Sequence, residues 1–339
     1  MSTNQENYTI ATMGSHTALQ ILKGAKDEGF RTACVVTKKT RPVYEHFGAC
    51  DTFIEIDDYS QFDPAIPQLK ALNSIVIPHG SFVAYLGHER MQQLDLMHYG
   101  TKDILEWESD RDKERKWLAR AGLRLPRIFS SPDEIDCAVI IKFHGADGGH
   151  GYFIANSPEE FYERIKVYDN GKKYVIQEYI VGVPMYVHYF YSPLTEDLEI
   201  MSFDKRYESN ADSIGRIAAQ DQIDADIRAS YTITGNIPLV VRESMLPMFY
   251  DIGRRVIAES KNLAPKGLYG PFCLEGIVDT HLNYSVFEIS ARIVAGTNPY
   301  VNGSPYTALR YDVPMSTGRR IARDIKEALA QDRLQDVLG

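Results

Sequence analysis

Short apolar runs alternate with amphipathic segments over the first hundred residues of the chain. Residues 15–29 carry apolar side chains at helical spacing, and Gly29 at their end is a residue type that ends helices in the left-handed conformation. The runs typical of strands cover residues 8–13, 32–37, 51–56 and 74–80. Apolar strands separated by helices predict a parallel sheet that is covered by helices on both faces.

Two short segments, 14–16 and 79–81, directly follow strands of this predicted sheet. Because ligands of such sheets bind at the carboxyl ends of the strands, His16 and Ser81 are candidate ligand contacts. A helix that begins near Ser15 would also offer free N–H groups to a phosphate. The alternative for His16 is a local hydrogen-bonding role without a ligand.

Strands dominate the pattern in the second half of the chain. Residues 106–120 come first and predict one charged helix, in which Trp107 and Trp117 are the apolar anchors and the charges face solvent. Further strands are expected at 137–143, 173–182, 183–192, 198–209, 270–279 and 283–293, and further helices at 245–262 and 315–337. The last two strands are close enough to form a hairpin. Since no Ser/Gly-rich linker separates these parts, we expect packed domains.

Composition and charge narrow the class of protein. The 339 residues carry a formal net charge of −9, and 44% of them are hydrophobic. An acidic chain of this kind is not expected to bind nucleic acid, and no apolar run is long enough to span a membrane. The 21 tyrosines could stack on bases, but packing in strands is the commoner use. Since the N-terminus lacks a secretory signal, we expect a cytoplasmic protein.

The four cysteines are Cys34, Cys50, Cys137 and Cys273, which lie far apart and form no CxxC pair. This spacing favours reduced thiols over a metal site or a disulfide framework.

A glycine-rich segment between two apolar runs is the first candidate for chemistry. In "VIIKFHGADGGHGYFIA", residues 139–155, Lys142 ends a predicted strand and four glycines follow within 145–151. Glycines let a backbone approach a polyphosphate closely, and a lysine adds positive charge beside it. The pattern is neither a P-loop nor a dinucleotide fingerprint, because the lysine precedes the glycines and a strand follows. A mobile hairpin without a ligand is the alternative.

Two glutamates lie in the predicted hairpin near the end of the chain. Glu275 and Glu288 are placed within otherwise apolar strands, and Arg292 follows Glu288 by four residues. A buried carboxylate is costly without a partner, and paired carboxylates together with phosphate oxygens suit Mg²⁺. Arg292 is then a candidate for holding a transferred phosphoryl group. Two surface glutamates are the alternative interpretation.

A third segment, "YVIQEYIVG", resembles a hinge that could contact an adenine and read a nucleotide. Its candidates are Gln177, Glu178 and Ile180. The order of the three segments is more informative than any one of them: a phosphate-loop lysine, a hinge, then two acidic strands that end in an arginine.

This order, after an N-terminal α/β unit, resembles the ATP-grasp superfamily. The resemblance implies an ATP-grasp fold of the α/β and α+β class with an N-terminal Rossmann-like parallel α/β domain. It also implies three domains: residues 1–105 bind substrate, 106–200 form the lobe with the phosphate flap, and 201–339 form the lobe with the metal-binding hairpin. Enzymes of this superfamily use ATP and Mg²⁺ to activate a carboxylate as an acyl phosphate for transfer to an amine.

Four longer stretches are similar to the archaeal family of formate-dependent formaminoimidazole-carboxamide ribonucleotide synthetases. They are "ATMGSHTALQILKGAKDEGFRT", "IPHGSFVAYLG", "TGNIPLVVRESML" and "ISARIVAGTNPYVNGSPY". The resemblance implies that His16, Ser81 and Asn236 contact aminoimidazole carboxamide ribonucleotide (AICAR). For Asn236, the residue pattern alone also allows a turn residue.

The resemblance also implies the residues that bind ATP and metal. The ATP set is Lys142, His144, Gly145, Gly148, Gly149, Gly151, Gln177, Glu178, Ile180 and Glu208. Glu275 and Glu288 would hold Mg²⁺ or Mn²⁺. One departure from the superfamily is Ser290, because many members carry Asn at this position, and a hydroxyl is a weaker metal ligand than an amide oxygen.

The resulting hypothesis is an ATP-dependent ligase of purine synthesis that formylates the amino group of AICAR through formyl phosphate, with Lys142 and Arg292 as catalytic cations. Its partners would be ATP, formate and AICAR, in a homo-oligomer. Two alternatives stay open. One is a related ligase that uses another small acid or amine, and the other is a nucleotide-binding regulatory protein without turnover.

Overall fold

The computed structural model describes residues 4–143, 152–168, 171, 173–209, 211–225, 227, 230 and 232–339. A five-stranded parallel sheet lies at the N-terminal end, in the order β3-β2-β1-β4-β5. Its strands are β1 (Thr9–Met13), β2 (Arg31–Val36), β3 (Thr52–Glu55), β4 (Ser74–Val76) and β5 (Met97–His98). The predicted parallel sheet is therefore confirmed.

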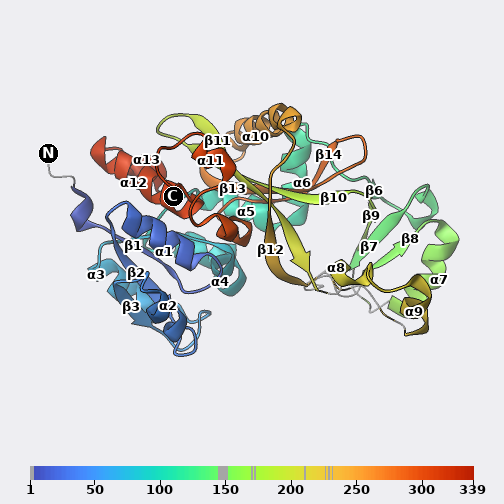
Figure 1. Ribbon diagram of the computed structural model, residues 1–339, viewed down its shortest axis with the longest axis horizontal. Helices are drawn as coiled ribbons and strands as arrows, with labels where there is room; N and C mark the ends of the chain where they lie inside the picture. The colour runs from blue at the N-terminus through green and yellow to red at the C-terminus, as the bar shows by residue number, and fades with distance from the viewer. Residues whose placement is uncertain are drawn as a thin grey trace.

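Helices cover both faces of this sheet (Figure 1). The N-terminal ones are α1 (Ala18–Asp27), α2 (Arg41–Phe47), α3 (Ile66–Ala71) and α4 (Gly80–Gln93). Gly29 has a φ of +88°, the left-handed conformation expected after α1. Alternation along β2 separates the faces, since Cys34 packs beside α1 and Ala33 packs on the opposite side.

The end of the chain completes this N-terminal unit. The closing helix predicted at 315–337 is two helices, α12 (Thr317–Ala330) and α13 (Leu334–Val337), separated by a turn in which Asp332 has a positive φ of 55°. In α12, Ile321 and Ile325 share one core with Ile10 of β1 and Ile21 of α1. The first and last described segments of the chain therefore fold together in one core.

The segment predicted as one charged helix is two helices, α5 (Leu105–Ser109) and α6 (Arg111–Arg120). Between them Asp110 has extended backbone angles, and its Oδ1 accepts from the N–H groups of Asp112 and Lys113 as the N-cap of α6. The expectation that the charges all face solvent is also wrong. The side chain of Glu108 is 7% exposed, and Glu114 as a whole residue is also 7% exposed. Both side chains therefore point into the protein.

A small antiparallel sheet, in the order β6-β9-β7-β8, lies at the other end of the molecule (Figure 1). Its strands are β6 (Ile128–Phe129), β7 (Val139–Phe143), β8 (Phe153–Ala155) and β9 (Tyr174–Glu178), and α7 (Pro158–Tyr168) packs on it. The predicted flap residues His144, Gly145, Gly148, Gly149 and Gly151 lie outside the described residues. The pairing of β7 with β8 places Ile141 opposite Phe153.

A five-stranded antiparallel sheet, in the order β12-β11-β10-β13-β14, lies between the other two. Its strands are β10 (Val183–Ser192), β11 (Asp197–Glu208), β12 (Ile233–Leu239), β13 (Gly270–Val278) and β14 (Tyr284–Ser290). The remaining helices are α8 (Ala211–Ile214), α9 (Ala219–Asp224), α10 (Leu246–Ser260) and α11 (Pro305–Ala308). The predicted hairpin is confirmed, whereas Asn236 lies within β12, so its interpretation as a turn residue is wrong.

The central sheet has one apolar and one polar face. On the apolar face Phe203 and Leu274 pack with Trp117 of α6 and Phe249 of α10 in the largest core. The domain boundary predicted at residue 200 falls inside β11, and β10 belongs to the central sheet. The three predicted domains stay a prediction, and the three sheets place the transition from the small to the central sheet between β9 and β10.

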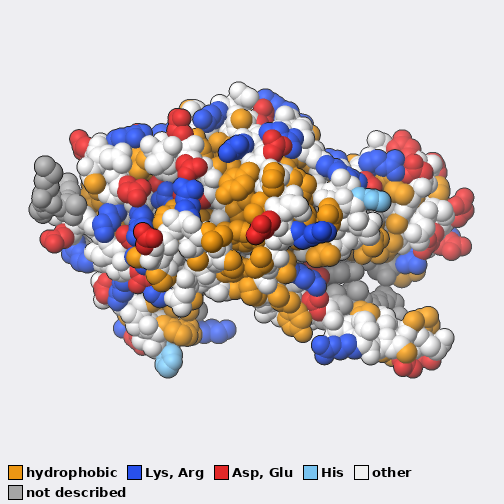
Figure 2. All heavy atoms as spheres, turned by 45° about the horizontal axis from the view of Figure 1, so that its top comes forward, with side chains coloured by type: hydrophobic (Ala, Val, Ile, Leu, Met, Phe, Trp, Pro, Cys, Tyr) orange, Lys and Arg blue, Asp and Glu red, His pale blue; other side chains and the backbone are white. Residues whose placement is uncertain are grey.

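The surface in Figure 2 mixes Lys and Arg with Asp and Glu side chains, and hydrophobic side chains form a band across the middle of this face. This face therefore carries no broad field of one sign. Among the described helices, none is both long enough and apolar enough to cross a bilayer.

Candidate active site

The polar face of the central sheet carries a row of ionisable side chains. Strand pairing places Asp204 opposite Tyr186, Tyr186 opposite Glu275, and Glu275 opposite Glu288, so that the row crosses β11, β10, β13 and β14. Directly opposed residues project from the same face of a sheet. Arg206 lies two residues after Asp204 and therefore on this face as well. The sheet register alone thus brings these groups together.

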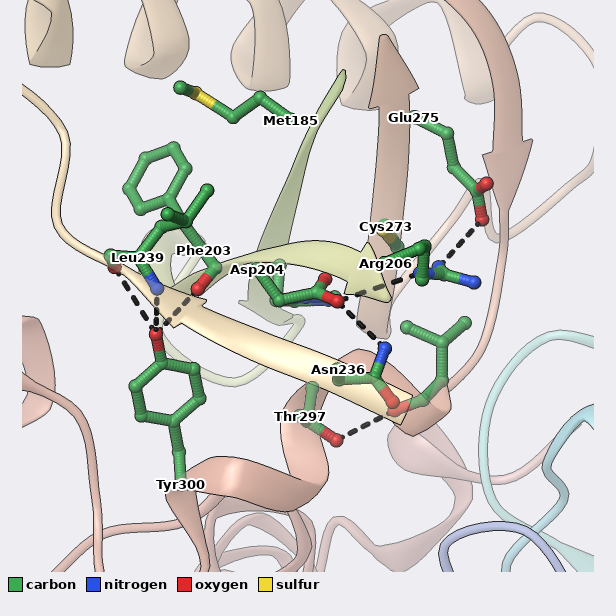
Figure 3. A network of polar contacts seen from close by, with 12 residues as sticks. Met185, Phe203, Asp204, Arg206, Asn236, Leu239, Cys273, Glu275, Thr297 and Tyr300 are labelled. Atoms are coloured by element: carbon green, nitrogen blue, oxygen red, sulfur yellow. Dashed lines mark hydrogen bonds and ion pairs between the residues drawn. The ribbon is translucent and has the colours of Figure 1, made fainter. Parts of the chain in front are cut away.

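Asp204 is the centre of a hydrogen-bonded network on this face (Figure 3). It is fully buried, and its Oδ1 lies 2.7 Å from His188 Nε2. Asn236 of β12 donates from Nδ2 to the other oxygen of Asp204 at 2.8 Å. Although burial opposes ionisation, the contacts with His188, Arg206 and Asn236 lower the pKa of Asp204. The residue is therefore a fixed carboxylate.

Arg206 connects this network to the glutamate pair. Its Nη2 lies 3.2 Å from Glu275 Oε1, and its Nε lies 3.5 Å from Asp204 Oδ2. The guanidinium carbon lies 4.1 Å from the centre of the Tyr186 ring, which fixes the plane of the group. Nε is buried, and no group in the described part of the chain accepts a hydrogen bond from it. Sequence reasoning missed Arg206 and Asp204, because "FDKRYE" reads as the polar end of a strand.

The paired glutamates differ in their surroundings. Glu275 is 8% exposed, whereas Glu288 is open to solvent. Burial raises the pKa of Glu275 to about 8, and the charge of Glu288 adds to this shift, while Arg206 opposes it. A divalent cation between the two carboxylates would relieve this repulsion, and carboxylate oxygens are the ligands that Mg²⁺ prefers. The donor set therefore fits the predicted metal.

In the part of the chain that the structure describes, Glu275 and Glu288 are not joined by further protein ligands for a metal. Within the described residues, no three side chains of His, Cys, Asp or Glu come together in a metal-binding arrangement. Ser290 is 4% exposed and lies opposite Cys273. A cation held by two carboxylates needs oxygens from a second source, and phosphates commonly supply them for Mg²⁺.

Glu108 and Glu114 contact the backbone at the end of β14, although the sequence pattern predicted that both face solvent. Ile289 donates its N–H to Glu114 Oε1 at 2.6 Å, and Ala291 donates its N–H to Glu108 Oε2 at 3.0 Å. The other oxygen of Glu108 lies 2.8 Å from Arg292 Nη2. A signal for Glu114 existed in the sequence, since the residue shares a helical face with Trp117, three positions later.

Two of the three predicted AICAR contacts, His16 and Ser81, lie at the carboxyl ends of β1 and β4, whereas Asn236 lies in β12. The rings of His16 and His79 stack with their centres 5.3 Å apart, and Ser81 Oγ donates to Ser15 Oγ at 2.9 Å. His79 receives the Ser81 N–H at Nδ1, so its Nε2 donates to the carbonyl of Met13 at 2.9 Å. This arrangement is the N-cap of α4.

His16 lies next to the cationic groups of the central sheet. A Cβ placed on Gly80 would lie 2.8 Å from His16 Nε2 and 3.2 Å from Arg292 Nη1, so the ring and the guanidinium face the same glycine. Although the residue is exposed in part, desolvation of the His16 ring by the surrounding protein lowers its pKa to about 3, and His79, Arg292 and Arg206 add to the shift. The imidazole is therefore uncharged at neutral pH.

Lys142 reaches the site from the small sheet. Its Nζ lies 3.4 Å from Gln177 Oε1 and 5.7 Å from the centre of the Phe287 ring, next to Glu288 in β14. Burial lowers the pKa of Lys142, and the charge of Arg111 lowers it further, while Glu288 and Glu114 oppose the shift. The cation thus lies between the two sheets and beside the acidic hairpin.

The other predicted nucleotide contacts are less closely grouped. Both the N–H and the carboxylate of Glu178 bond to the backbone of Arg127, at 2.8 and 2.9 Å, which joins β9 to β6. Ile180 follows β9 and is half-buried. Glu208 ends β11, where its N–H donates to Asp212 and where burial raises its pKa. Their roles toward a nucleotide stay predictions.

Family models match most of the chain. Residues 10–129 match the model described as "Protein of unknown function (DUF1246)", and residues 157–339 match "Domain of unknown function (DUF1297)". Neither description gives an activity.

Curated relatives carry a name. A protein of Pyrococcus abyssi is 51% identical over 97% of this chain and 98% of its own length, and one of Thermococcus kodakarensis is 52% identical over 97% and 99%. Both are named 5-formaminoimidazole-4-carboxamide-1-(beta)-D-ribofuranosyl 5'-monophosphate synthetase.

Solved structures agree with this result. An IMP biosynthesis protein PurP from Thermococcus kodakaraensis has a TM-score of 0.77 at 30% identity, covering 97% of this chain and 100% of that one. The ADP complex of purK, N5-carboxyaminoimidazole ribonucleotide synthetase, has a TM-score of 0.67 at 12% identity and covers 94% of this chain and 77% of that one. At this identity the similarity supports only the ATP-grasp fold. The chain belongs to the 5-formaminoimidazole-4-carboxamide-1-(beta)-D-ribofuranosyl 5'-monophosphate synthetase family.

Proposed function

We propose that this protein is an ATP-dependent carbon–nitrogen ligase that joins formate to the 5-amino group of AICAR in the synthesis of IMP. One observation supports the proposal most strongly. Residues at the ends of β1 and β4 face Arg292 at the end of β14, where the acidic hairpin lies. An amine acceptor bound at the parallel sheet would therefore lie beside a phosphoryl group held at the hairpin. The names of the relatives support the choice of substrates.

The first step is the activation of formate. A formate oxygen attacks the γ-phosphorus of ATP, so that a new O–P bond forms, the bond to the β–γ bridging oxygen breaks, and ADP leaves. Lys142 and Arg292 would offset the negative charge on the transferred group, since phosphoryl transfer depends mainly on positioning and electrostatics. Glu108 holds Arg292 in place at 2.8 Å.

The second step is transfer of the formyl group. The 5-amino nitrogen of AICAR attacks the carbonyl carbon of formyl phosphate, a C–N bond forms, the C–O bond to phosphate breaks, and the nitrogen loses a proton. His16 is uncharged in this site and can accept a hydrogen bond from the amino group. Asn236 donates to Asp204 from Nδ2, which leaves its carbonyl oxygen as the atom available to a ligand.

Glu275 and Glu288 would hold Mg²⁺ or Mn²⁺, and the bound cation would neutralise charge on the phosphates of ATP. Lys142 approaches the same hairpin from the small sheet, so ATP is expected between the two sheets. Assembly into a homo-oligomer stays a prediction.

Release of ADP from purified protein with Mg-ATP tests the proposal. We expect ADP only when formate and AICAR are both present, together with a nucleotide that is heavier by one formyl group. Glu288→Gln should lose this activity, whereas Glu163→Gln, on the exposed face of α7, should keep it.

Other results would replace the proposal. ADP release that follows a different carboxylate or amine would identify the related ligase, and the formate assignment would be wrong. ATP binding without turnover under any of these conditions would support a regulatory protein.

A further inference from the structure

The small carboxylate substrate must bind next to both the phosphoryl group of ATP and the amine acceptor. This inference rests on the proposed function, in which one oxygen of formate attacks a phosphoryl group and its carbon later meets an amine. The carboxylate must therefore lie between the hairpin with Glu275 and the residues that face the acceptor. Formate offers little surface for binding, so a cation with fixed geometry is needed to hold it.

Arg206 occupies this intermediate position. On one side its Nη2 contacts Glu275 at 3.2 Å, and on the other its Nε faces Asp204, which binds Asn236 at 2.8 Å (Figure 3). The charge of Arg206 also acts on His16, where it contributes to the lowered pKa. The guanidinium is thus near the predicted metal ligands and near the predicted acceptor contacts.

The surroundings of Arg206 leave part of its binding capacity unused. The side chain is 11% exposed, and its plane is fixed against Tyr186 at 4.1 Å. Nε has no hydrogen-bond acceptor in the described part of the chain. The oxygens of Asp204 lie 2.7 Å from His188 and 2.8 Å from Asn236. The distance to Arg206 is longer, at 3.5 Å. A planar fork of this kind matches the two oxygens of a carboxylate.

A second buried arginine, Arg320, differs from Arg206 in its hydrogen-bond partners. Arg320 also lies over an aromatic ring, with its guanidinium carbon 4.3 Å from the centre of Phe190. It bonds to Glu199 at 2.8 Å and to Asp324 at 3.3 Å, and both contacts are hydrogen bonds. Arg320 is therefore satisfied by its own carboxylates, whereas Arg206 retains an unpaired donor in the site.

We propose that Arg206 binds the small carboxylate substrate, with its guanidinium edge directed to the carboxylate oxygens while Asp204 and Tyr186 hold it in place. A cation held by Glu275 and Glu288 would weaken the contact between Glu275 and Arg206 and leave the guanidinium to the substrate. The alternative role of this contact is to orient Glu275 as a metal ligand, with no contact between Arg206 and the carboxylate substrate. The two roles predict changes in different quantities, so they can be separated.

Two variants of Arg206 and one control test the proposal. Arg206→Lys keeps the charge but loses the fork, and Arg206→Gln loses both; Arg320→Gln removes an arginine with similar packing outside the site. We expect KM for formate to rise by about 10-fold or more in both Arg206 variants, since hydrogen bonds to charged groups have this magnitude. KM for ATP and for AICAR should change by less than about 2-fold.

Mn²⁺ binding without formate, followed by electron paramagnetic resonance, separates the two roles of Arg206. Unchanged Mn²⁺ affinity together with the higher KM for formate supports the carboxylate site. Weaker Mn²⁺ binding with an unchanged KM for formate would show that Arg206 only orients Glu275, and would overturn the proposal.

A binding measurement that needs no turnover completes the test. In the presence of Mg-ADP, the nuclear magnetic resonance line of isotope-labelled formate should broaden with the unmodified protein and with Arg320→Gln. The broadening should be lost with Arg206→Gln. Broadening that persists in Arg206→Gln, or that is absent from the unmodified protein, would overturn the inference. Binding that depends on Arg206 without formylation of AICAR would instead reject the proposed function and keep the carboxylate site.

Discussion

Glu114 is a buried carboxyl group whose protonation is linked to folding. Burial raises its pKa from 4.5 to about 9, and the charge of Glu288 adds to the shift, while the Ile289 N–H opposes it. Between these two values the folded chain binds a proton that the unfolded chain has released. By linkage, this group makes the free energy of unfolding fall as pH rises through that window.

Glu114→Gln should remove this dependence on pH, because an amide keeps an oxygen for the Ile289 N–H and cannot ionise. The free energy of unfolding of the variant, relative to the unmodified protein, should increase from about pH 6 to about pH 9. Denaturant unfolding of the metal-free protein measures it, with Glu163→Gln on the exposed face of α7 as control. A difference that is constant with pH would contradict the assignment.

At the scale of elements, the break between α5 and α6 determines where two buried glutamate side chains lie. The two separate helices direct Glu114 to the N–H of Ile289 in β14 and Glu108 to the N–H of Ala291 just after it, which a continuous helix would not do. Asp110 produces the break, because its extended backbone ends α5 and its side chain caps α6. The positions of Arg292 and of β14 therefore depend on one helix cap.

Asp110→Ala should lower the free energy of unfolding by about 1 kcal/mol, the usual value for a lost N-cap. Asp110→Asn keeps the side-chain oxygen and should lose much less. Thermal unfolding of the three proteins checks the order. Equal losses in both variants would show that the charge of Asp110, rather than the cap, is the stabilising feature.

At the scale of the whole molecule, α1 and α12 join the two ends of the chain at very short range. A Cβ on Gly24 would lie 2.2 Å from the Arg319 nitrogen, and one on Gly318 would lie 2.4 Å from the Gln20 carbonyl oxygen. The contact is therefore between backbones, and only glycine allows it. Around it Glu28 pairs with Arg319 at 2.6 Å and with Arg323 at 2.7 Å.

Gly24→Ala should lower the free energy of unfolding by about 1–3 kcal/mol, the usual cost of overpacking, even though alanine favours helices. Gly215→Ala is the control, since a Cβ there meets no atom within 4 Å. Its effect should stay within about 0.5 kcal/mol. Calorimetry of the two variants gives the comparison, and a stable Gly24→Ala protein would show that the two helices can separate without cost.

The sequence predicted those parts of the fold in which pattern and packing agree. Apolar strands gave the parallel sheet, and Glu275 and Glu288 stood out because carboxylates are rare within apolar strands. The closing helix, by contrast, was predicted without its partner. Nothing in the spacing of Ile321 and Ile325 says that they pack beside Ile10, since that choice depends on the tertiary fold.

The candidate site shows the same limit. Arg206 and Asp204 lie in a run of polar residues that is typical of the end of a strand, and only the pairing of β11 with β10 and of β10 with β13 brings them to the face that carries Glu275. Glu108 was assigned to solvent because a charged helix usually faces it. In both cases the deciding information is which strand or helix comes to lie opposite, and that is a property of residues distant in sequence.

The joined ends have a consequence for how the protein is made. Since β1 and α1 share their core with α12, the first unit to leave the ribosome lacks part of its packing until residues 317–330 have followed it. The nascent N-terminal sheet must remain partly open until α12 has been synthesised, with apolar positions such as Ile10 and Ile21 uncovered. His16, at the carboxyl end of β1, would thus reach its final surroundings only after residues 317–330 have been synthesised.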